Sequence, residues 1–371
     1  MDRTMNDREK RHVAFYIGSL KKGGAERVFV NLARYFVSRG YRVTLVTQYE
    51  KENEYPLPTG ADRILSDLAP EEEGNRIQNL LRRYKKLRRI FKGLKADVVL
   101  STIGKNNFMA ILANLFLPTR VVVSVVAEPT EEYPDALMRF LAKTLFYLAD
   151  GIVMQTRDAV RFFQPSLQKK CVILKNSVNP AFLRPRYEGK RRQDIVAVGR
   201  MDANKNQSMA IRAFSKIAGE FPESRLILYG DGPLRGQLQD LARELGLEGR
   251  VSLPGAVNDV ADRIEKAWVF LLTSFTEGMP NTLLEAMSLG LACISTDCPC
   301  GGPKDVIRDG INGYLVKVDD ADGLSERLRE LLSDPAKMQR IGKEAARLRE
   351  SYSPERVNRE WESYFSGIVG K

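Results

Sequence analysis

Apolar and polar positions along the chain follow a rhythm that predicts strands separated by helices. Short apolar runs bounded by turn residues predict strands, because parallel strands covered on both faces read as near-continuous apolar segments. The predicted strands are 13–18, 42–47, 98–102, 121–126, 151–155 and 171–174 in the first half, and 194–198, 225–229, 268–273 and 292–296 in the second. Between them, apolar residues recur at helical spacing, as at Phe29, Leu32 and Phe36. The pattern predicts an α/β fold with parallel sheets.

This rhythm occurs twice, and a polar, basic stretch over residues 185–193 separates the two halves. At 371 residues the chain exceeds one typical domain. We expect one domain over 1–188, a second over 189–352, and a C-terminal helix over 353–371 that packs back on the first. Rossmann-like, doubly wound domains bind ligands at the carboxyl ends of their strands, so we expect a ligand in a cleft that both domains face.

Composition is that of an ordinary soluble globular protein, with 43% hydrophobic and 28% charged residues. Residues 1–11 are polar and charged with no apolar core after them, so we expect no signal peptide and a cytoplasmic location. The apolar stretch 108–127 is interrupted by Asn114, Pro118 and Arg120, which predicts a buried helix followed by a strand and not a membrane span.

The positive charge is concentrated in the first half. Residues 1–192 carry 35 Lys and Arg against 20 Asp and Glu, a net charge of +15, whereas residues 193–371 carry 23 against 27, a net charge of −4. Such asymmetry indicates that the halves meet different partners. A nucleic-acid partner is not expected, because no aromatic residues interleave with phosphate-binding ones in a recognised motif.

The segment 76–95 has nine Lys and Arg and no acidic residue. Its apolar residues fall on one helical stripe: Ile77, Leu80, Leu81, Tyr84, Leu87, Phe91 and Leu94. One interpretation is a basic amphipathic helix that docks on an anionic membrane and meets a polyprenyl-linked acceptor. The other is a helix whose stripe packs on the sheet while its basic face is solvated; only the charge density favours lipid.

Cysteine and histidine give no metal site. Cys293, Cys298 and Cys300 match no common zinc spacing, and the sole histidine, His12, is distant in sequence. The four cysteines also give no disulfide framework. We expect neither a metal nor a cofactor beyond a substrate.

Residues 275–286 combine a strand end, a glycine turn and a helix start. Pro280 is predicted to open the helix, and the free backbone N–H groups of such a start form a seat for a diphosphate. The residues of this turn and helix start are Gly278, Met279, Pro280, Asn281 and Thr282. Glu277 precedes the seat and Glu285 lies about one turn inside, where carboxylates can accept hydrogen bonds from sugar hydroxyls. Alternatively, Glu277 is an ordinary solvated loop residue and Glu285 interacts with the dipole of the helix.

Two further segments carry candidate ligand-binding residues, each directly after the first predicted strand of its half of the chain. Gly199, Arg200 and Lys205 follow the first strand of the second half, where cations stabilise charge on a departing diphosphate, although alone they also fit an ordinary surface loop. Gly23 and Gly24 follow the first strand of the chain and let the backbone approach a ligand. They lack the three spaced glycines of a dinucleotide fingerprint.

These motifs, with Gly230-Asp231-Gly232-Pro233, occur in the order and spacing of glycosyltransferase family 4, which the chain resembles over nearly its whole length. The resemblance implies a GT-B fold, a retaining mechanism and no metal requirement. It implies that Arg200 and Lys205 hold the donor diphosphate, Glu277 contacts the transferred sugar and Glu285 holds the ribose. Arg200, Lys205 and Glu277 are thus the expected catalytic residues; Gly23 and Gly24 would approach the donor phosphates and the acceptor.

The segment 277–281 together with 297–303 resembles the branch of the family that builds bacterial surface glycans, many of whose members use UDP-hexosamines or UDP-hexoses. Several relatives carry a histidine near the transferred sugar that this chain lacks. Glu128 is the candidate for orienting the acceptor there, and a plain loop glutamate is an equal alternative. The leaving phosphate itself can take the acceptor proton.

The sequence therefore predicts a retaining, metal-independent transferase that moves a hexose or N-acetylhexosamine from a UDP-sugar to a polyprenyl-diphosphate-linked glycan in surface polysaccharide synthesis. It would work in the cytoplasm, at the inner face of the membrane. The open alternatives are a GDP- or ADP-sugar donor, a soluble acceptor, a UDP-sugar epimerase, and a nucleotide-sugar binder without catalysis.

Overall fold

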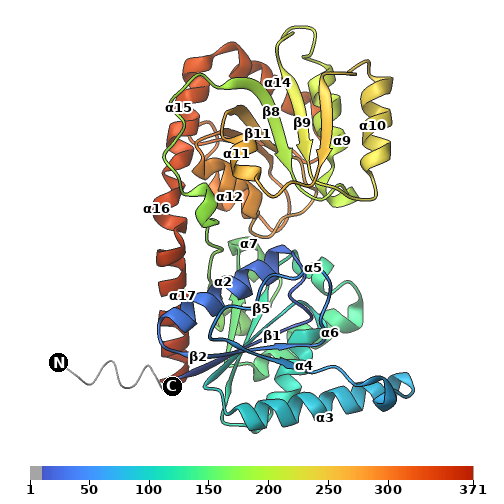
Figure 1. Cartoon of the computed structure of the whole chain (residues 1–371), viewed down its shortest axis with the longest axis vertical. Coiled ribbons are helices and arrows are strands. Elements are labelled where there is room, and N and C mark those ends of the chain that lie inside the picture. The colour runs from blue at the N-terminus through green and yellow to red at the C-terminus, as the bar shows by residue number, and fades with distance from the viewer. Residues whose placement is uncertain (1–10, 371) are drawn as a thin grey trace, which may run out of the picture. The chain divides into compact units, whose positions relative to one another are not determined.

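The computed structural model describes residues 11–370 and divides them into two compact units (Figure 1). Unit 1 comprises the described residues up to Lys175 together with those from Val357 onward, and unit 2 is Asn176–Arg356. The segment behind the expectation of no signal peptide lies, except for Arg11, outside the described residues.

Within residues 11–370, unit 1 forms a seven-stranded sheet in the order β3-β2-β1-β4-β5-β6-β7, with every neighbouring pair parallel. Its strands are β1 (His12–Ile17), β2 (Arg42–Thr47), β3 (Asp62–Leu65), β4 (Val98–Thr102), β5 (Arg120–Val125), β6 (Gly151–Met154) and β7 (Cys171–Ile173). Only β3 was not predicted from the sequence, because this edge strand is half exposed and carries no apolar run.

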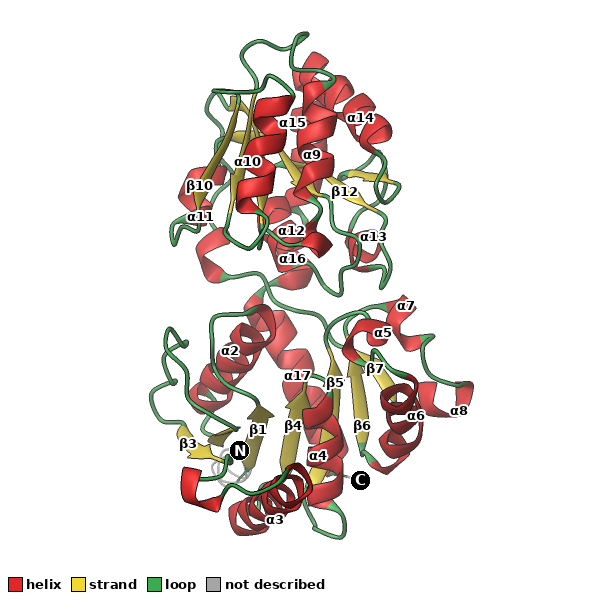
Figure 2. Ribbon diagram, turned by 90° about the vertical axis from the view of Figure 1, so that its right-hand side faces the viewer, coloured by secondary structure: helices red, strands yellow, loops and turns green. Residues whose placement is uncertain are grey.

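The helices of unit 1 cover both faces of this sheet. They are α2 (Gly24–Ser38), α3 (Arg76–Leu94), α4 (Lys105–Asn114), α5 (Pro129–Glu132), α6 (Ala136–Leu145), α7 (Arg157–Val160) and α8 (Pro165–Gln168). Helices α3, α4 and α6 lie on one face (Figure 2). On the other face, α2 contributes Phe29 and Phe36 to a core that contains Phe15 of β1.

The last helix, α17 (Pro354–Val369), supplies apolar residues to that same core. The ring of Phe365 stacks on Phe36 with centroids 5.4 Å apart, and the hydroxyl of Tyr35 donates to Glu362 at 2.7 Å. At its start, the Ser353 hydroxyl accepts from the backbone N–H of Arg356 at 3.4 Å. The C-terminal residues therefore complete unit 1.

Unit 2, in the described part of the chain, forms a six-stranded sheet in the order β10-β9-β8-β11-β12-β13, again parallel throughout. Its strands are β8 (Arg192–Val198), β9 (Arg225–Tyr229), β10 (Val251–Gly255), β11 (Ala267–Leu272), β12 (Ala292–Thr296) and β13 (Tyr314–Val316). The sequence did not predict β10, an edge strand that contains Pro254, or β13, which is only three residues long.

Helices cover this sheet on both faces: α9 (Gln207–Ser215), α10 (Arg235–Glu244), α11 (Val260–Ile264), α12 (Asn281–Ser288), α13 (Gly302–Val306), α14 (Ala321–Ser333), α15 (Pro335–Ala346) and α16 (Leu348–Tyr352). None of the helices in residues 11–370 combines the length and the apolar character that spanning a bilayer requires.

The division between the units falls at 175/176 and not at 188/189, because the intervening residues pack on unit 2. Val178 and Phe182 are buried in a core of unit 2, and the N–H of Val178 donates to the carbonyl of Tyr352 at 2.9 Å. Within the basic stretch that we interpreted as a linker, the buried guanidinium of Arg191 donates to three carbonyls.

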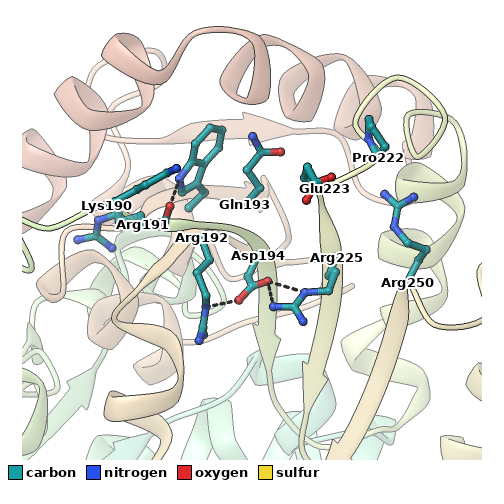
Figure 3. Close-up of a pocket in the computed structure, with 10 residues that line it drawn as sticks. Lys190, Arg191, Arg192, Gln193, Asp194, Pro222, Glu223, Arg225 and Arg250 are labelled. Atoms are coloured by element: carbon teal, nitrogen blue, oxygen red, sulfur yellow. Dashed lines mark hydrogen bonds and ion pairs between the residues drawn. The ribbon is translucent and has the colours of Figure 1, made fainter.

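That stretch runs directly into β8 and lines a cavity of about 550 Å³ at the amino ends of the strands (Figure 3). There Arg192 and Arg225 both pair with the buried Asp194, at 2.7 and 2.9 Å. The guanidinium of Arg250 is held by the carbonyls of Ser224 and Phe221. These contacts fix the basic residues as part of unit 2.

Candidate active site

In unit 2 the strand order reverses direction between β8 and β11, so the loops that follow these two strands diverge. Doubly wound sheets bind ligands at such a switch point, outside the carboxyl ends of the strands. The loop after β8 contains Gly199, Arg200 and Lys205, and the loop after β11 contains Glu277. The topology thus brings together segments that are more than seventy residues apart in the sequence.

Asn204 binds the two loops to each other. Its carbonyl accepts from the N–H of Phe275 at 2.8 Å, its Oδ1 accepts from the N–H of Thr276 at 3.0 Å, and its Nδ2 donates to the carbonyl of Thr276 at 3.1 Å. A side chain that satisfies both backbone groups of one residue fixes the loop in a single arrangement. Asn204 is therefore a positioning residue that the sequence reasoning passed over.

The structure brings two of the predicted residues into direct contact. Nζ of Lys205 lies 2.5 Å from Oε1 of Glu277, and the hydroxyl of Ser274 donates to the same oxygen at 2.6 Å. The side chains are 26% and 11% exposed, so water screens this ion pair only in part. The main chain of Lys205 is also fixed, because its carbonyl accepts from the hydroxyl of Thr273 at 2.9 Å.

Arg200 lies in the same loop with an exposed side chain. Its Nε donates to Asp202 at 2.5 Å, which leaves the remaining N–H groups of the guanidinium fork for a ligand. Asp202 also accepts from the N–H of Lys205 at 3.0 Å, and the side-chain amide of Gln207 donates to the carbonyl of Arg200 at 2.9 Å. One carboxylate therefore orients both predicted diphosphate-binding cations.

The helix start beside this ion pair differs slightly from the prediction. Pro280 precedes α12 at its N-cap, and the first helical residue is Asn281, whose Oδ1 accepts from Asn176 at 3.1 Å. Gly278 and Thr282 are half-buried, whereas the side chain of Met279 is buried in the core. Glu285 is buried on the second turn of the helix.

Three glycines permit the close packing of these loops. A Cβ on Gly230 would lie 1.9 Å from the carbonyl oxygen of Gly199, and one on Gly302 would lie 1.6 Å from that of Gly278. A Cβ on Gly232 would likewise lie 2.4 Å from the carbonyl oxygen of Met201. Gly199 itself faces only the Lys205 side chain at 3.6 Å or more. The need for glycine therefore falls on Gly230, Gly232 and Gly302, where main chain meets main chain.

The thiols of Cys293 and Cys298, which lie near the site, are unreactive at neutral pH. Burial, followed by the neighbouring charge of Glu277, raises the pKa of Cys298 to about 12, and burial also raises the pKa of Cys293. Thiols in this state carry little thiolate at neutral pH. Among residues 11–370, no group of three or more His, Cys, Asp or Glu side chains is arranged to hold a metal ion.

In unit 1 the predicted glycine pair lies at the start of α2, with Gly23 at the N-cap and Gly24 as the first helical residue. A Cβ on Gly23 would lie 2.4 Å from Oε2 of Glu26, so the space beside this glycine is filled by a carboxylate of the same helix. Burial raises the pKa of Glu26. A carboxylate at a helix start is stabilised by the free N–H groups there.

A second carboxylate holds the loop that leads to this glycine pair. Oε1 of Glu54 accepts from the N–H groups of Leu20 and Lys51 at 3.1 and 2.9 Å, and Oε2 lies 2.6 Å from the guanidinium of Arg63. These partners lower the pKa of Glu54 despite its burial, which alone would raise it. No sequence pattern distinguishes this residue from the other acids of its loop.

The predicted acceptor residue, Glu128, is half-buried and caps α5 by accepting from the backbone N–H of Thr130 at 3.5 Å, and it also accepts from the Thr130 hydroxyl at 3.1 Å. A neighbouring acid, Glu132, contacts the main chain of two different loops. Its oxygens accept from the N–H groups of Gly104 and Val126, at 2.8 and 3.1 Å. Those groups follow β4 and β5, so Glu132 links two strand ends. Burial raises its pKa.

Similar proteins were found by sequence and by structure. Residues 22–182 match the model of glycosyltransferase family 4, and residues 182–348 match that of glycosyl transferases group 1. The chain is 30% identical over 356 residues to the N-acetylgalactosamine-N,N'-diacetylbacillosaminyl-diphospho-undecaprenol 4-alpha-N-acetylgalactosaminyltransferase of Campylobacter jejuni, covering 91% of this chain and 94% of the relative.

A second Campylobacter jejuni protein, the alpha-1,4-N-acetyl-D-galactosaminyltransferase that acts on GalNAc-alpha-(1->4)-GalNAc-alpha-(1->3)-diNAcBac-PP-undecaprenol, is 26% identical over 94% of this chain and 96% of its own. Among solved structures, Anabaena HepE in complex with UDP and glucose superposes with a TM-score of 0.80 at 16% identity, covering 96% of this chain and all of that one. At that identity the likeness shows the fold alone.

Proposed function

Because this chain belongs to glycosyltransferase family 4 and has the two doubly wound units of the GT-B fold, we propose how it uses them. It is a glycosyltransferase of surface-glycan synthesis that moves a hexose or N-acetylhexosamine from a UDP-sugar to a polyprenyl-diphosphate-linked glycan. Transfer retains the anomeric configuration and needs no metal. The observation that carries the proposal is the Lys205–Glu277 ion pair at the switch point of unit 2, beside the exposed guanidinium of Arg200.

This arrangement suits a diphosphate joined to a sugar. The exposed fork of Arg200 binds phosphate oxygens, Lys205 adds a second cation, and the start of α12 adds free backbone N–H groups. Glu277, held by Lys205 and Ser274, accepts hydrogen bonds from hydroxyls of the transferred sugar. Two protein cations beside the leaving group supply the charge stabilisation that a metal ion supplies in other enzymes.

In the proposed reaction, the bond between the sugar C1 and the UDP oxygen breaks and a bond from C1 to the acceptor oxygen forms on the same face. The acceptor hydroxyl proton passes to the departing β-phosphate, so no protein base is required. Arg200 and Lys205 stabilise the charge that develops on that phosphate. This assignment agrees with the local role of Glu128, which caps a short helix.

Three similar proteins bear on the substrates. The Campylobacter jejuni enzymes are named for acceptors on diphospho-undecaprenol and for transfer of N-acetylgalactosamine, and HepE was solved with UDP and glucose. They support a UDP-sugar donor and a lipid-linked acceptor for this chain.

The donor proposal is tested by thermal stabilisation without added metal, comparing UDP, GDP and ADP and their sugar conjugates. We expect UDP and UDP-sugars to raise the melting temperature and Arg200→Ala to abolish the rise, while the exposed control Arg243→Ala on α10 keeps it. Stabilisation by GDP or ADP alone would overturn the UDP assignment. Near-normal turnover by Arg200→Ala or Lys205→Ala would overturn the catalytic assignment, and inversion at C1 in the product would overturn retention.

The acceptor proposal rests on α3, whose apolar stripe divides into two parts. Leu87, Phe91 and Leu94 are buried, so this part packs on the unit as a core helix does. Toward the N-terminus the stripe is uncovered, with Ile77, Leu80 and Leu81 at 72%, 58% and 52% exposed. The helix therefore belongs to the core at one end and presents an amphipathic face at the other.

Phe116, in the loop after α4, is 97% exposed and adopts a left-handed backbone with φ of 61°. Arg88 of α3 donates to the carbonyls of Ala113 and Leu115 at 3.0 and 2.7 Å, which holds this loop beside α3. An unfavourable backbone conformation that exposes a large apolar ring indicates a surface with a partner.

The cations of α3 favour an anionic membrane as that partner. Arg76, Lys85 and Arg89 have no ion-pair or hydrogen-bond partner for their side chains in the described part of the chain. Each basic residue near an anionic surface contributes about 1 kcal/mol of attraction, and inserted leucines add apolar burial. We propose that the N-terminal half of α3 and Phe116 dock unit 1 on the membrane that holds the acceptor.

Vesicle sedimentation tests this docking. Binding should require anionic lipid, weaken with salt, and fall in the pair Leu80→Gln/Leu81→Gln, whereas Leu245→Gln, an exposed leucine of unit 2, should leave it unchanged. Equal binding to neutral and anionic vesicles, or full binding by the α3 variant, would refute it.

A further inference from the structure

A cavity of about 520 Å³ lies in unit 2 beside the loop that carries Arg200 and Lys205. Its volume falls in the range of small-molecule sites. Its walls come from the loop after β8, from α9 and α10, and from the loops after β11 and β13. It shares Asp202 and Gln207 with the candidate active site, where these residues hold Arg200 in place.

The polar lining of this cavity consists mainly of carboxylates and amides. Asp202 and Asp319 contribute carboxylates, Gln207 and Gln237 contribute amides, and Arg212 is the one cation among the described lining residues. Because Arg200 neutralises Asp202, Asp319 and Arg212 are the charges left in the lining, and their balance gives a phosphate or another anion no net attraction. Such a lining suits hydroxyls instead, since a carboxylate accepts from O–H groups and an amide can both accept from them and donate to them.

The remaining lining is apolar and includes an aromatic ring. Phe275, which lies two residues before Glu277, is exposed, and leucines of α10 line the cavity beside it. A ring of this kind packs against the C–H face of a ligand whose hydroxyls point toward polar groups. The ligand class that combines an apolar face with a rim of hydroxyls is a neutral pyranose.

One lining residue has an unmet hydrogen bond. Gln207 is 6% exposed, and its Nε2 donates to the carbonyl of Arg200, but its Oε1 has no hydrogen-bond partner among the described residues. A buried carbonyl oxygen without a donor is uncommon in folded proteins and is unfavourable. A ligand hydroxyl that enters the cavity, with a small rotation of the amide, supplies that donor.

We propose that this cavity is a saccharide subsite that binds one neutral pyranose of the acceptor glycan. The inference rests on the proposed function, because a glycosyltransferase of glycan chains must hold sugar residues beyond the one it modifies. Binding there contacts Asp202 and Gln207, and both fix the loop of Arg200 and Lys205. Occupancy of the subsite is thereby coupled to the donor-binding loop.

The direct test measures saccharide binding to the full chain by isothermal titration, with the methyl glycoside of an α-1,4-linked N-acetylgalactosamine disaccharide as the probe. Gln237→Ala and Phe275→Ala should each weaken binding by about tenfold or more, as loss of a hydroxyl partner or a packing ring does. Gln239→Ala is the matched control, because it changes an exposed glutamine of the same helix that does not line the cavity. No binding by the wild type, or equal binding by all four proteins, would overturn the subsite.

A second measurement separates the subsite from the proposed function. Stabilisation by UDP should be the same in Gln237→Ala and the wild type. If UDP binds neither protein while Gln237→Ala still loses the disaccharide, the donor proposal fails and the subsite stands.

Transfer kinetics then identify the source of the sugar. A KM that rises in Gln237→Ala for acceptors with several sugar residues, but not for the shortest acceptor, supports the acceptor glycan. An equal rise for every acceptor, or no rise for any, would overturn that assignment.

Discussion

The ion pair between Lys205 and Glu277 should contribute measurably to the stability of unit 2, and a double-mutant cycle can isolate its contribution. The cycle uses Lys205→Met, Glu277→Gln and the combined variant. Methionine keeps the length of the apolar stem of lysine, and glutamine keeps the shape of glutamate, so the changes remove charge with little change in packing. The pairwise energy is the amount by which the combined variant departs from the sum of the single ones.

The magnitude follows from distance and burial. At 2.5 Å and an effective dielectric constant of about 20, the Coulomb attraction is about 7 kcal/mol. Both groups are mostly withdrawn from water, so desolvation offsets most of that attraction. We expect a coupling of about 1–2 kcal/mol, above the ~0.5 kcal/mol of exposed pairs. Lys205→Met should cost more than Glu277→Gln, because it leaves a largely buried carboxylate with Ser274 as its one remaining side-chain hydrogen-bond partner among the described residues.

The assay can report on unit 2 alone. The chain has two tryptophans, Trp268 in unit 2 and Trp361 in unit 1. In a Trp361→Phe background, urea unfolding followed by fluorescence therefore reports the transition of unit 2. The exposed pair Lys216–Asp322 serves as the control cycle, with Lys216→Met and Asp322→Asn, and should give a coupling below about 0.5 kcal/mol.

A coupling no larger than that of the control cycle would refute the reasoning, since it would mean that the Lys205–Glu277 contact contributes no more than a solvated pair. A rise in stability in both single variants would refute it as well. It would show that each charge is held at a cost, as happens where a site is organised for a ligand and not for stability.

Other parts of the structure give further tests. Gly302→Ala should destabilise unit 2 by about 2 kcal/mol or more because its Cβ would overlap the carbonyl of Gly278, whereas Gly219→Ala, which meets nothing within 4 Å, should be near neutral in the same urea assay. Glu54→Ala should raise amide hydrogen exchange in residues 18–24 and leave α10 unaffected; unchanged exchange in that loop would contradict its positioning role. Burial lowers the pKa of His12 below 6.5, so the unfolded chain binds a proton more readily than the folded one, and the free energy of unfolding should fall as the pH drops from about 6.5 to the folded pKa and then level off. His12→Gln should flatten that dependence, and an equally steep fall in the variant would assign it to another group.

The sequence predicted the strands that carry a continuous apolar run and missed those at the margins of the sheets. β2 and β9 begin and end where their apolar pattern does, because burial on both faces leaves a direct mark on composition. β3, β10 and β13 are short or half-exposed and owe their extension to pairing with a neighbour. Pairing between distant segments leaves no local pattern to read.

Within the candidate site, the residue types and their loops were predictable, but their partners were not. The charges of Arg200, Lys205 and Glu277 indicated a diphosphate and a sugar, yet nothing in their spacing says that Lys205 contacts Glu277 directly. Asn204 could not be identified, since an asparagine in a loop looks the same whether it caps a turn or holds another segment. The stripe on α3 was predicted, but only the fold shows which half is covered.

The chain returns to unit 1 at its C-terminal end, so unit 2 can finish folding before unit 1 while the protein is made on a ribosome. Unit 2 is a continuous segment and has all of its residues once synthesis passes Arg356. Unit 1, although it begins the chain, still lacks Trp361, Phe365 and Ile368 from its core at that moment. Its apolar surface around Phe36 therefore stays uncovered until the final helix emerges. A premature stop near the end of the message would leave the later-made unit intact and the earlier-made one without its closing helix.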